Sequence, residues 1–245
     1  MPHERAEEAR AAMLELFPEG FEEAERANGV ELAAYTDAGG EERLWHVFGG
    51  AHSTAVDDGW EDRWRDFHRP VRVGPVWIGP PWHQPPPEAL AVIIDPGRAF
   101  GTGGHATTRL CLELLLDLER GSLLDVGCGS GVLAIAGARL GFGPVTALDS
   151  DPAAVEAARR NAEANGVALD VLHADALRDT LPCAETAVAN VTLQAVQGVA
   201  PRLDVRRLVA SGYLEGERPL IAGYEEVERR RAEGWAADLL ERATE

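Results

Sequence analysis

Three glycines, Gly127, Gly129 and Gly131, alternate with other residues directly after the expected strand that ends at Val126. Glycine at the end of a strand permits a tight turn into a helix and lets a ligand approach the backbone closely. A dinucleotide-binding fingerprint requires GxGxxG, but Val132 stands where its third glycine would be. The segment therefore favours a nucleotide-type site of another kind, with a purely structural turn as the alternative.

A carboxylate, Asp149, ends the next apolar run, 22 residues beyond Gly127. An acidic residue at that distance can accept hydrogen bonds from both ribose hydroxyls of an adenosyl group. A helix N-cap is the structural alternative, but Asp151 before Pro152 fits that role better because proline favours the first helical position. The GxGxG spacing after Asp125, together with this second carboxylate, resembles the first motifs of the Rossmann-like S-adenosylmethionine methyltransferases. We therefore expect Asp149 to bind the ribose.

A second glycine-rich segment holds four glycines within residues 97–104, directly before an expected helix. Free N–H groups at a helix N-terminus can donate hydrogen bonds to the anionic carboxylate of a ligand. We therefore expect this segment, with Phe100, Gly101 and Thr102, to cover a bound cofactor. His105 at its end has two interpretations, a member of the reacting centre or a histidine that packs the loop, and the second is the commoner role of an isolated histidine.

Two further polar residues follow expected strands. Asp175 comes after the third strand, and it is either a group near the edge of an adenine or a solvated loop acid. Asn190 ends the fourth strand, where a methyl-accepting amine would sit, and its alternative role is to close a turn. Because ligands of parallel sheets bind outside the carboxyl ends of the strands, we favour a ligand-facing place for Asn190.

The composition excludes several kinds of chemistry. All 23 basic residues are Arg, so no lysine can form a Schiff base or bind phosphate in a P-loop. The 41 acidic residues give a net charge of -18, the wrong sign for holding a phosphate backbone, so we expect no naked nucleic acid as partner. Cys111, Cys128 and Cys183 are too widely spaced for a zinc knuckle or a disulfide framework, so we expect no metal and a reducing compartment. No run approaches 18 apolar residues, so we expect a cytoplasmic protein without a membrane segment.

From about Ala89 the sequence alternates apolar strands with helices. This order predicts an α/β fold with a parallel sheet, helices on both faces and right-handed crossovers. The expected strands are 90–94, 122–126, 144–149, 169–173, 186–190 and 208–211. The expected helices are 107–118, 132–140, 152–165 and 225–235.

The chain before this alternation predicts a small α+β domain and a linker. The expected elements of the domain are a helix over 5–16 and short strands near Phe21, over 30–35 and over 44–48. The linker combines a Trp-rich helix over 60–67 with a proline-rich segment, 70–87, whose apolar residues predict short strands. We therefore expect a small α+β domain at 1–58, a linker at 59–88 and a Rossmann-like S-adenosylmethionine methyltransferase domain at 89–245.

The segments DPGRAFGTGGHATT, LLDVGCGSGVLAI, VTALDSDP and VANV occur in this order. With them, the chain from Trp60 to about Gly223 resembles the bacterial ribosomal protein methyltransferases that modify large-subunit protein eleven. The resemblance implies a two-domain enzyme that recruits this ribosomal protein through its N-terminal domain and methylates lysine side chains and the N-terminal amine. It also implies that His105 and Asn190 lie nearest the methyl acceptor, as the candidate catalytic residues. The expected S-adenosylmethionine site comprises Phe100, Gly101, Thr102, Thr107, Thr108, Asp125, Gly127, Gly129, Gly131, Asp149, Ser150, Asp175 and Asn190.

The chain departs from the family pattern at several points. The family loop usually contains His-His-Glu-Thr-Thr, whereas this chain has Gly104-His105-Ala106-Thr107-Thr108, with one imidazole and one carboxylate fewer. We also expect the N-terminal domain to lack its first strand and the main sheet to be one edge strand short. Two alternatives stay open: a methyltransferase for another protein, RNA or a small molecule, and a cofactor-binding module without catalysis.

Overall fold

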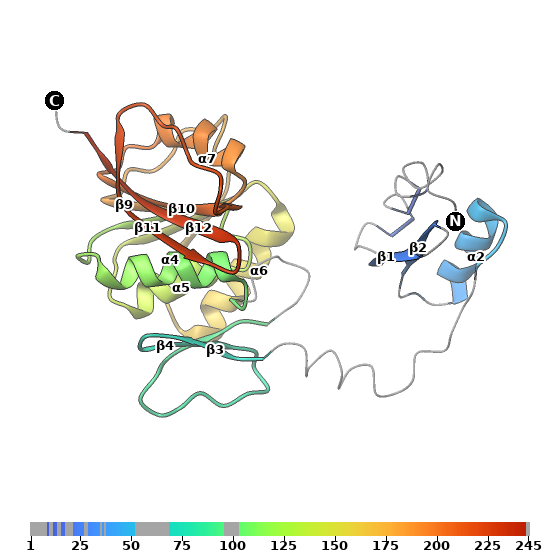
Figure 1. The fold of residues 1–245 in the computed structure, drawn as a ribbon. Helices are drawn as coiled ribbons and strands as arrows, with labels where there is room; N and C mark the ends of the chain where they lie inside the picture. Colours follow the sequence, from blue (N-terminus) through green and yellow to red (C-terminus); the bar gives the residue numbers. More distant parts are fainter. Residues whose placement is uncertain are drawn as a thin grey trace. The chain divides into compact units, whose positions relative to one another are not determined.

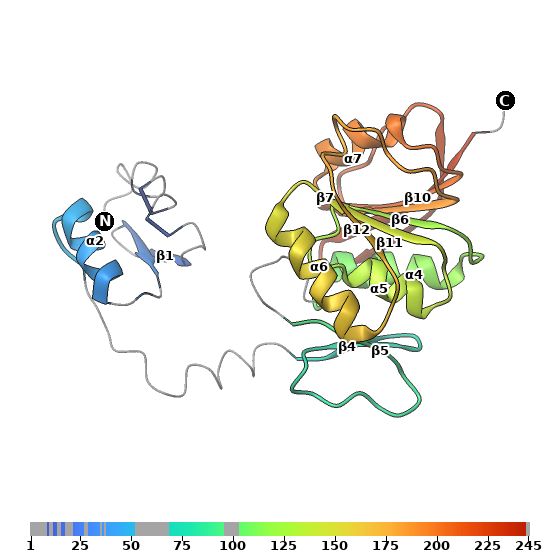
Figure 2. The same ribbon diagram turned by 180° about the vertical axis from the view of Figure 1, so that it is seen from behind.

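The computed structural model describes residues 9, 12, 13, 16, 17, 22–26, 29–34, 36, 38–51, 69–95 and 103–243. The chain divides into two compact units, Met1–Glu61 and Asp62–Glu245. Figure 1 and Figure 2 draw the fold from two opposite sides. The expected Trp-rich helix over 60–67 lies outside the described residues.

The first unit contains a β-hairpin and helical residues. β1 (Glu22–Arg26) and β2 (Gly29–Ala33) pair antiparallel, and Val30 of β2 is buried. Ala9, Ala12, Met13 and Leu16 are helical, in agreement with the helix predicted over 5–16. Ala9 and Met13 are also buried, as their helical spacing suggests.

The strand predicted over 44–48 is wrong, because these residues end the helix α2 (Ala38–Phe48). A short apolar run cannot be assigned to strand or helix by periodicity alone, and the preceding Glu41-Glu42-Arg43 favours a helix. Trp45 and Val47 are about half exposed, so this apolar run is not the buried strand that its composition suggested.

The second unit is built on a seven-stranded sheet in the order β11-β12-β10-β9-β6-β7-β8. The strands from β10 to β8 in this order are parallel, whereas β12 is antiparallel to both β10 and β11. All five strands predicted between residues 122 and 211 are confirmed. The bounds are β6 (Leu123–Val126), β7 (Val145–Asp149), β8 (Asp170–His173), β9 (Thr186–Asn190), β10 (Arg207–Leu214), β11 (Tyr224–Ala232) and β12 (Trp235–Arg242).

The chain direction across this sheet creates a crevice. After β6 the chain adds β7 and β8 on one side, and it then returns to place β9 on the other side of β6. Ligands of such sheets bind at this reversal, outside the carboxyl ends of the strands. The carboxyl ends of β6, β7 and β9 are therefore the place to look for a site.

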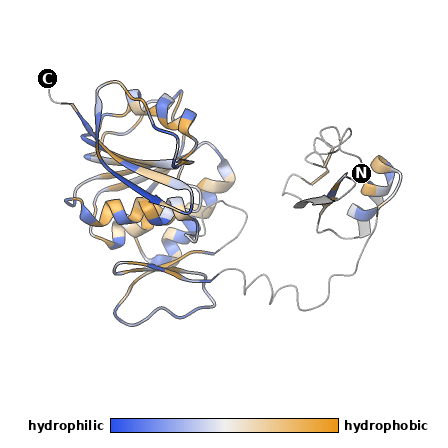
Figure 3. Ribbon diagram, viewed as in Figure 1, coloured by the Kyte–Doolittle hydropathy of each residue, from blue (hydrophilic) through white to orange (hydrophobic). Residues whose placement is uncertain are grey.

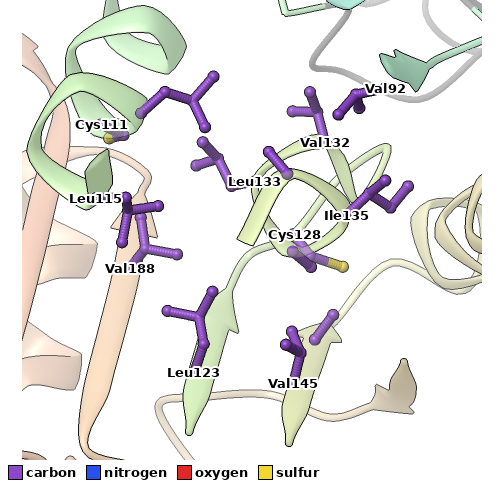
Figure 4. Close-up of a cluster of buried hydrophobic side chains, with 14 of the residues drawn as sticks. Val92, Cys111, Leu115, Leu123, Cys128, Val132, Leu133, Ile135, Val145 and Val188 are labelled. Carbon is purple, nitrogen blue, oxygen red and sulfur yellow. The ribbon is translucent and has the colours of Figure 1, made fainter. Parts of the chain in front are cut away.

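Helices cover both faces of the sheet (Figure 1). α4 (Ala106–Asp117), α5 (Val132–Arg139) and α6 (Pro152–Asn165) lie on one face, and α7 (Leu193–Val199) with a short 3-10 helix (Ala200–Arg202) lies on the other. Figure 3 shows the apolar character of α4, most of whose residues are buried. Figure 4 shows a cluster of buried side chains from β6, α5 and the turn between them, among them Leu123, Cys128, Val132 and Ile135.

The strand predicted over 90–94 exists, but it does not belong to the main sheet. β5 (Leu90–Ile93) pairs parallel with β4 (Val76–Gly79), and β4 pairs with β3 (Val71–Val73), in a separate three-stranded sheet. The Asn165 side chain of α6 accepts from Ile93 N at 2.8 Å and donates to Ile93 O at 2.7 Å. This side chain takes the place of a strand partner and ties the small sheet to the outer side of the helices.

The C-terminal region corrects two expectations. Residues predicted as a helix over 225–235 form β11 and the start of β12, and the sheet is not one edge strand short, because β12 fills the position beside β10. Glu233 and Gly234 form the turn of this hairpin, with φ of 52° and 79°. A two-residue turn with two positive φ values matches the twist of antiparallel strands. No helix in the described ranges is long and apolar enough to cross a membrane.

Candidate functional site

An open pocket with about 470 Å³ of empty space lies at the carboxyl ends of β6, β7, β8 and β9. Its walls come from the turns that follow these strands and from α7. Apolar side chains make up most of the lining, and two carboxylates face it. The lining residues are Val126, Gly127, Leu148, Asp149, Ser150, Ala174, Asp175, Ala176, Leu177, Val191, Ala195 and Val199.

The glycine-rich turn builds the floor of this pocket. Gly127, Gly129 and Gly131 all have positive φ, between 54° and 79°, where a side chain is strained. A Cβ on Gly127 would lie 2.5 Å from Cγ1 of Val191, so glycine also allows the turn to approach the end of β9. Gly127 N donates to Leu148 O at 2.9 Å, which fixes the turn to β7. Gly127 lines the pocket, whereas Gly129 and Gly131 shape the turn behind it.

Asp149 is the central carboxylate of the pocket. Its Oδ2 accepts from Gly129 N and its Oδ1 from Asp151 N, each at 2.9 Å. A carboxylate has about four acceptor positions, so two remain for hydroxyl donors of a ligand. Asp151 is the N-cap of α6, where its side chain accepts from Ala153 N, as the sequence predicts.

Asp125 does not line the pocket, although the sequence placed it in the cofactor site. Its side chain is 1% exposed, and its Oδ2 accepts from Ala134 N of α5 at 3.0 Å. Burial raises the pKa of Asp125 to about 7; the Ala134 bond lowers this pKa and the charge of Asp149 raises it. Asp125 therefore supports the turn from behind.

Asp175 and Ser150 lie in the pocket wall. Asp175 Oδ1 accepts from Leu177 N at 2.9 Å, and its Oδ2 forms an ion pair with Arg178 at 3.3 Å. The carboxylate thus closes the turn after β8 while facing the pocket. The adjoining Leu177 is half exposed and supplies an apolar surface beside it.

A second group of expected residues lies where α4 begins and β9 ends. Asn190 Nδ2 donates to Thr108 Oγ1 at 3.4 Å, and both Thr107 and Thr108 are buried. His105 is the N-cap of α4: its Nδ1 accepts from Thr107 N at 3.4 Å and lies 2.8 Å from Thr107 Oγ1. The ring of Trp235 meets the His105 ring edge to face at 4.8 Å. His105 therefore caps α4 and packs against Trp235.

The structure thus divides the expected site residues by position. The pocket wall contains Gly127, Asp149, Ser150 and Asp175, and the second group contains His105, Thr107, Thr108 and Asn190. Phe100, Gly101 and Thr102 lie outside the described residues. Asn190 precedes Val191, a residue of the pocket wall, so β9 joins the two groups.

Several residues of the pocket and of the second group were not predicted from the sequence. Ala195 and Val199 come from α7, whose seven residues are too few to show a helical apolar pattern. Trp235 was missed because its segment was assigned to a helix. The sequence signal for the hairpin of β11 and β12 was the Glu233-Gly234 pair followed by the apolar residues that begin at Trp235. Among the described residues, no cluster of three or more His, Cys, Asp or Glu could hold a metal ion.

Comparison with known proteins gives consistent matches. A family model described as "Ribosomal protein L11 methyltransferase (PrmA)" matches residues 4–237. The ribosomal protein L11 methyltransferase of Pelobacter propionicus is 40% identical over 216 residues, which is 78% of this chain and 69% of that protein. The Escherichia coli protein of the same name is 41% identical over 181 residues, which is 69% of this chain and 59% of its own length.

A solved structure is also similar. The crystal structure of a ribosomal protein L11 methylase from Lactobacillus delbrueckii subsp. bulgaricus matches 72% of this chain and all of that chain. The TM-score is 0.63 and the sequence identity is 26%. The matched parts thus share both sequence and fold.

Proposed function

The chain belongs to the ribosomal protein L11 methyltransferase (PrmA) family, and from this premise we propose that it transfers methyl groups from S-adenosylmethionine to amines of ribosomal protein L11. One observation carries the proposal beyond the family: an apolar pocket with two carboxylates lies at the carboxyl ends of the strands, and Asn190 directly precedes Val191 of its wall. The pocket suits an adenosyl group, and the amide suits an amine.

The residues of the pocket fit S-adenosylmethionine by their chemistry. Asp149 would accept from the ribose hydroxyls, Asp175 from the adenine amino group, and Leu148 and Leu177 would pack against the base. The same residues disfavour a dinucleotide. Gly129 N donates to Asp149 instead of facing a pyrophosphate, and Val132 stands where the third glycine of a dinucleotide fingerprint would be.

The second group supplies the acceptor end of the site. S-adenosylmethionine, when bound, provides a methyl group on a positive sulfonium that a neutral amine can attack in line. The Nδ2 of Asn190 donates to Thr108 Oγ1. We therefore propose that the Oδ1 of Asn190 accepts a hydrogen bond from an N–H of the incoming amine. Holding the nitrogen lone pair in line is the main catalytic task of such a site.

The amine must also lose a proton before it reacts. A lysine side chain has an ordinary pKa near 10.4, so it enters the site mainly protonated. Loss of water around it and the nearby sulfonium both lower this pKa, because both disfavour the charged ammonium. The described residues of the second group, His105, Thr107, Thr108 and Asn190, contain no carboxylate that would stabilise the ammonium.

We assign recruitment of the protein substrate to the first unit. The net charge of -18 suits a basic ribosomal protein, because opposite charge raises the rate of encounter. α2 exposes Trp45 at 52% and Val47 at 51%, and exposed aromatic side chains are frequent anchors of protein interfaces.

A methylation assay with purified components tests the proposal. The protein is incubated with S-adenosylmethionine and recombinant ribosomal protein L11, and methylated amines are located by mass spectrometry. We expect methyl groups on lysine side chains and the N-terminal amine. Label found instead in ribosomal RNA or in small molecules would support the corresponding alternative substrate. Binding of S-adenosylmethionine without transfer would support a non-catalytic module.

A further inference from the structure

β10 contains a bulge directly beside Asn190. The pairing of β10 with β12 shifts between Ser211 and Tyr213, so Gly212 is an extra residue on β10. On its other side β10 pairs with β9, and the last pair of that ladder joins Ser211 to Asn190. The bulge therefore begins next to Asn190, at the end of β9. Bulges beside active sites commonly re-aim a neighbouring side chain.

Gly212 packs against the residue that follows Asn190. A Cβ on Gly212 would lie 2.1 Å from the carbonyl oxygen of Val191 and 2.9 Å from its nitrogen. Gly212 also has a φ of 100°, and Val191 N donates to Ser211 O at 3.1 Å. Because the contact is with backbone atoms, a side chain at 212 could be accommodated only by moving the backbone of Val191, directly after Asn190, or that of the bulge itself.

A buried polar network holds the bulge in place. Tyr213 Oη donates to Asp238 Oδ2 at 2.6 Å, and Arg229 Nη1 donates to both Asp238 oxygens at 3.1 and 2.9 Å. Arg229 Nη2 then donates to Glu215 O at 2.9 Å and to Glu217 O at 2.6 Å. The Arg229 and Asp238 side chains are 5% and 0% exposed. The network therefore fixes both Tyr213 and the segment that follows β10.

Stability alone does not account for this network. A buried ion pair often stabilises a fold no better than apolar residues of similar size, because both charges lose their hydration. What it does provide is a fixed geometry. The neighbouring backbone carries Asn190, whose amide must hold an amine in line with a methyl group.

We propose that Gly212, held by the Tyr213–Asp238–Arg229 network, is a positioning residue that sets the orientation of the Asn190 amide for methyl transfer. The proposal rests on the proposed function for its catalytic consequence. Gly212, Tyr213, Asp238 and Arg229 are not among the residues that line the pocket, so they act through the backbone of Val191. The expected signature is a loss of turnover with little change in cofactor binding.

The first test compares Gly212→Ala with Gly141→Ala. Gly141 is a matched control, because its φ is 94° and an added Cβ would have no atom within 4 Å. Gly212→Ala is expected to lower kcat for amine methylation at least about tenfold, with KM for S-adenosylmethionine changed less than about threefold. Gly141→Ala is expected to keep both constants. Equal kcat values for the two variants would overturn the proposal.

A double variant separates positioning from general damage. If Gly212 acts through Asn190, adding Gly212→Ala to Asn190→Ala should cause no further loss of kcat. Independent, multiplicative losses would show that Gly212 acts by another route, and the proposal would then be wrong.

An activity-independent measurement completes the test. The side-chain amide signal of Asn190, identified in NMR spectra by its absence in Asn190→Ala, is expected to shift in Gly212→Ala and in Tyr213→Phe. Tyr213→Phe keeps the ring and removes the hydroxyl contacts with Asp238 Oδ2 and Ala210 O, so it is the milder variant. If the Asn190 amide signal is unchanged in both variants, Gly212 does not set the orientation of this amide and the proposal is wrong. If the wild-type protein methylates no amine, the proposed function fails, and the amide signal still decides this inference.

Discussion

Replacement of Asp149 by Ala tests the assignment of the cofactor pocket. The substitution removes the acceptor of the Gly129 and Asp151 N–H groups and the two acceptor positions that remain for the ribose. Hydrogen bonds to a charged group contribute about 1.5 to 3 kcal/mol each, and the partial exposure of Asp149 puts both ribose bonds at the lower end. Their loss of about 3 kcal/mol corresponds to an affinity for S-adenosylhomocysteine lowered about 100-fold.

Isothermal titration calorimetry with S-adenosylhomocysteine measures this affinity directly. Asp151→Ala is the matched control, because it removes a neighbouring carboxylate that caps α6 and does not line the pocket. The control is expected to lower the free energy of unfolding by about 1 kcal/mol and to leave the affinity unchanged within about threefold. The pocket assignment would be refuted if Asp149→Ala bound the ligand as tightly as the wild-type protein, or if both variants lost affinity equally.

Three further predictions follow from the site and the fold. Asn190→Ala should lower kcat at least about tenfold, with S-adenosylhomocysteine affinity within about threefold in calorimetry; a matching fall in affinity would place Asn190 in cofactor binding instead. Trp45→Ala should raise KM for ribosomal protein L11 and leave S-adenosylhomocysteine binding intact; an unchanged KM would argue against recruitment through α2. Asp125→Asn should gain stability relative to the wild type as the pH rises from about 4 to about 7. The raised pKa of Asp125 means that the folded protein keeps a proton which the unfolded chain releases, so this group destabilises the wild type across that window. Urea unfolding of both proteins at several pH values measures this change in stability. A stability difference between them that does not depend on pH would contradict the raised pKa of Asp125.

The sequence was most informative where local signals and tertiary pairing agree. The bounds of β9 and α6 are those predicted, because β9 has an apolar centre between Thr186 and Asn190 and α6 has an N-cap, a proline and a C-terminal glycine. The 224–242 region shows the opposite case. Its Glu and Arg residues favour a helix, but cross-strand pairs such as Arg229 with Asp238 and the Glu233-Gly234 turn stabilise a hairpin.

The site shows a similar limit. Spacing after the glycines was enough to predict that Asp149 lies at the carboxyl end of a strand, in the pocket wall, because the end of a parallel strand has a fixed place in the fold. Spacing did not show where Asp125 points. Alternation along β6 turns Leu123 and Asp125 toward the α5 face, so the carboxylate meets Ala134 rather than the pocket. The separate sheet containing β5 was equally hidden, since an apolar strand does not specify its partner.

The most direct test of the account is transfer of an isotopically labelled methyl group from S-adenosylmethionine to ribosomal protein L11. The wild-type protein, Asp149→Ala and Asn190→Ala are compared at saturating substrate, with labelled residues identified by mass spectrometry. We expect label on lysine side chains and the N-terminal amine with the wild-type protein, and a strongly reduced rate with both variants. Absence of amine label with the wild type, or undiminished rates in the variants, would contradict this expectation.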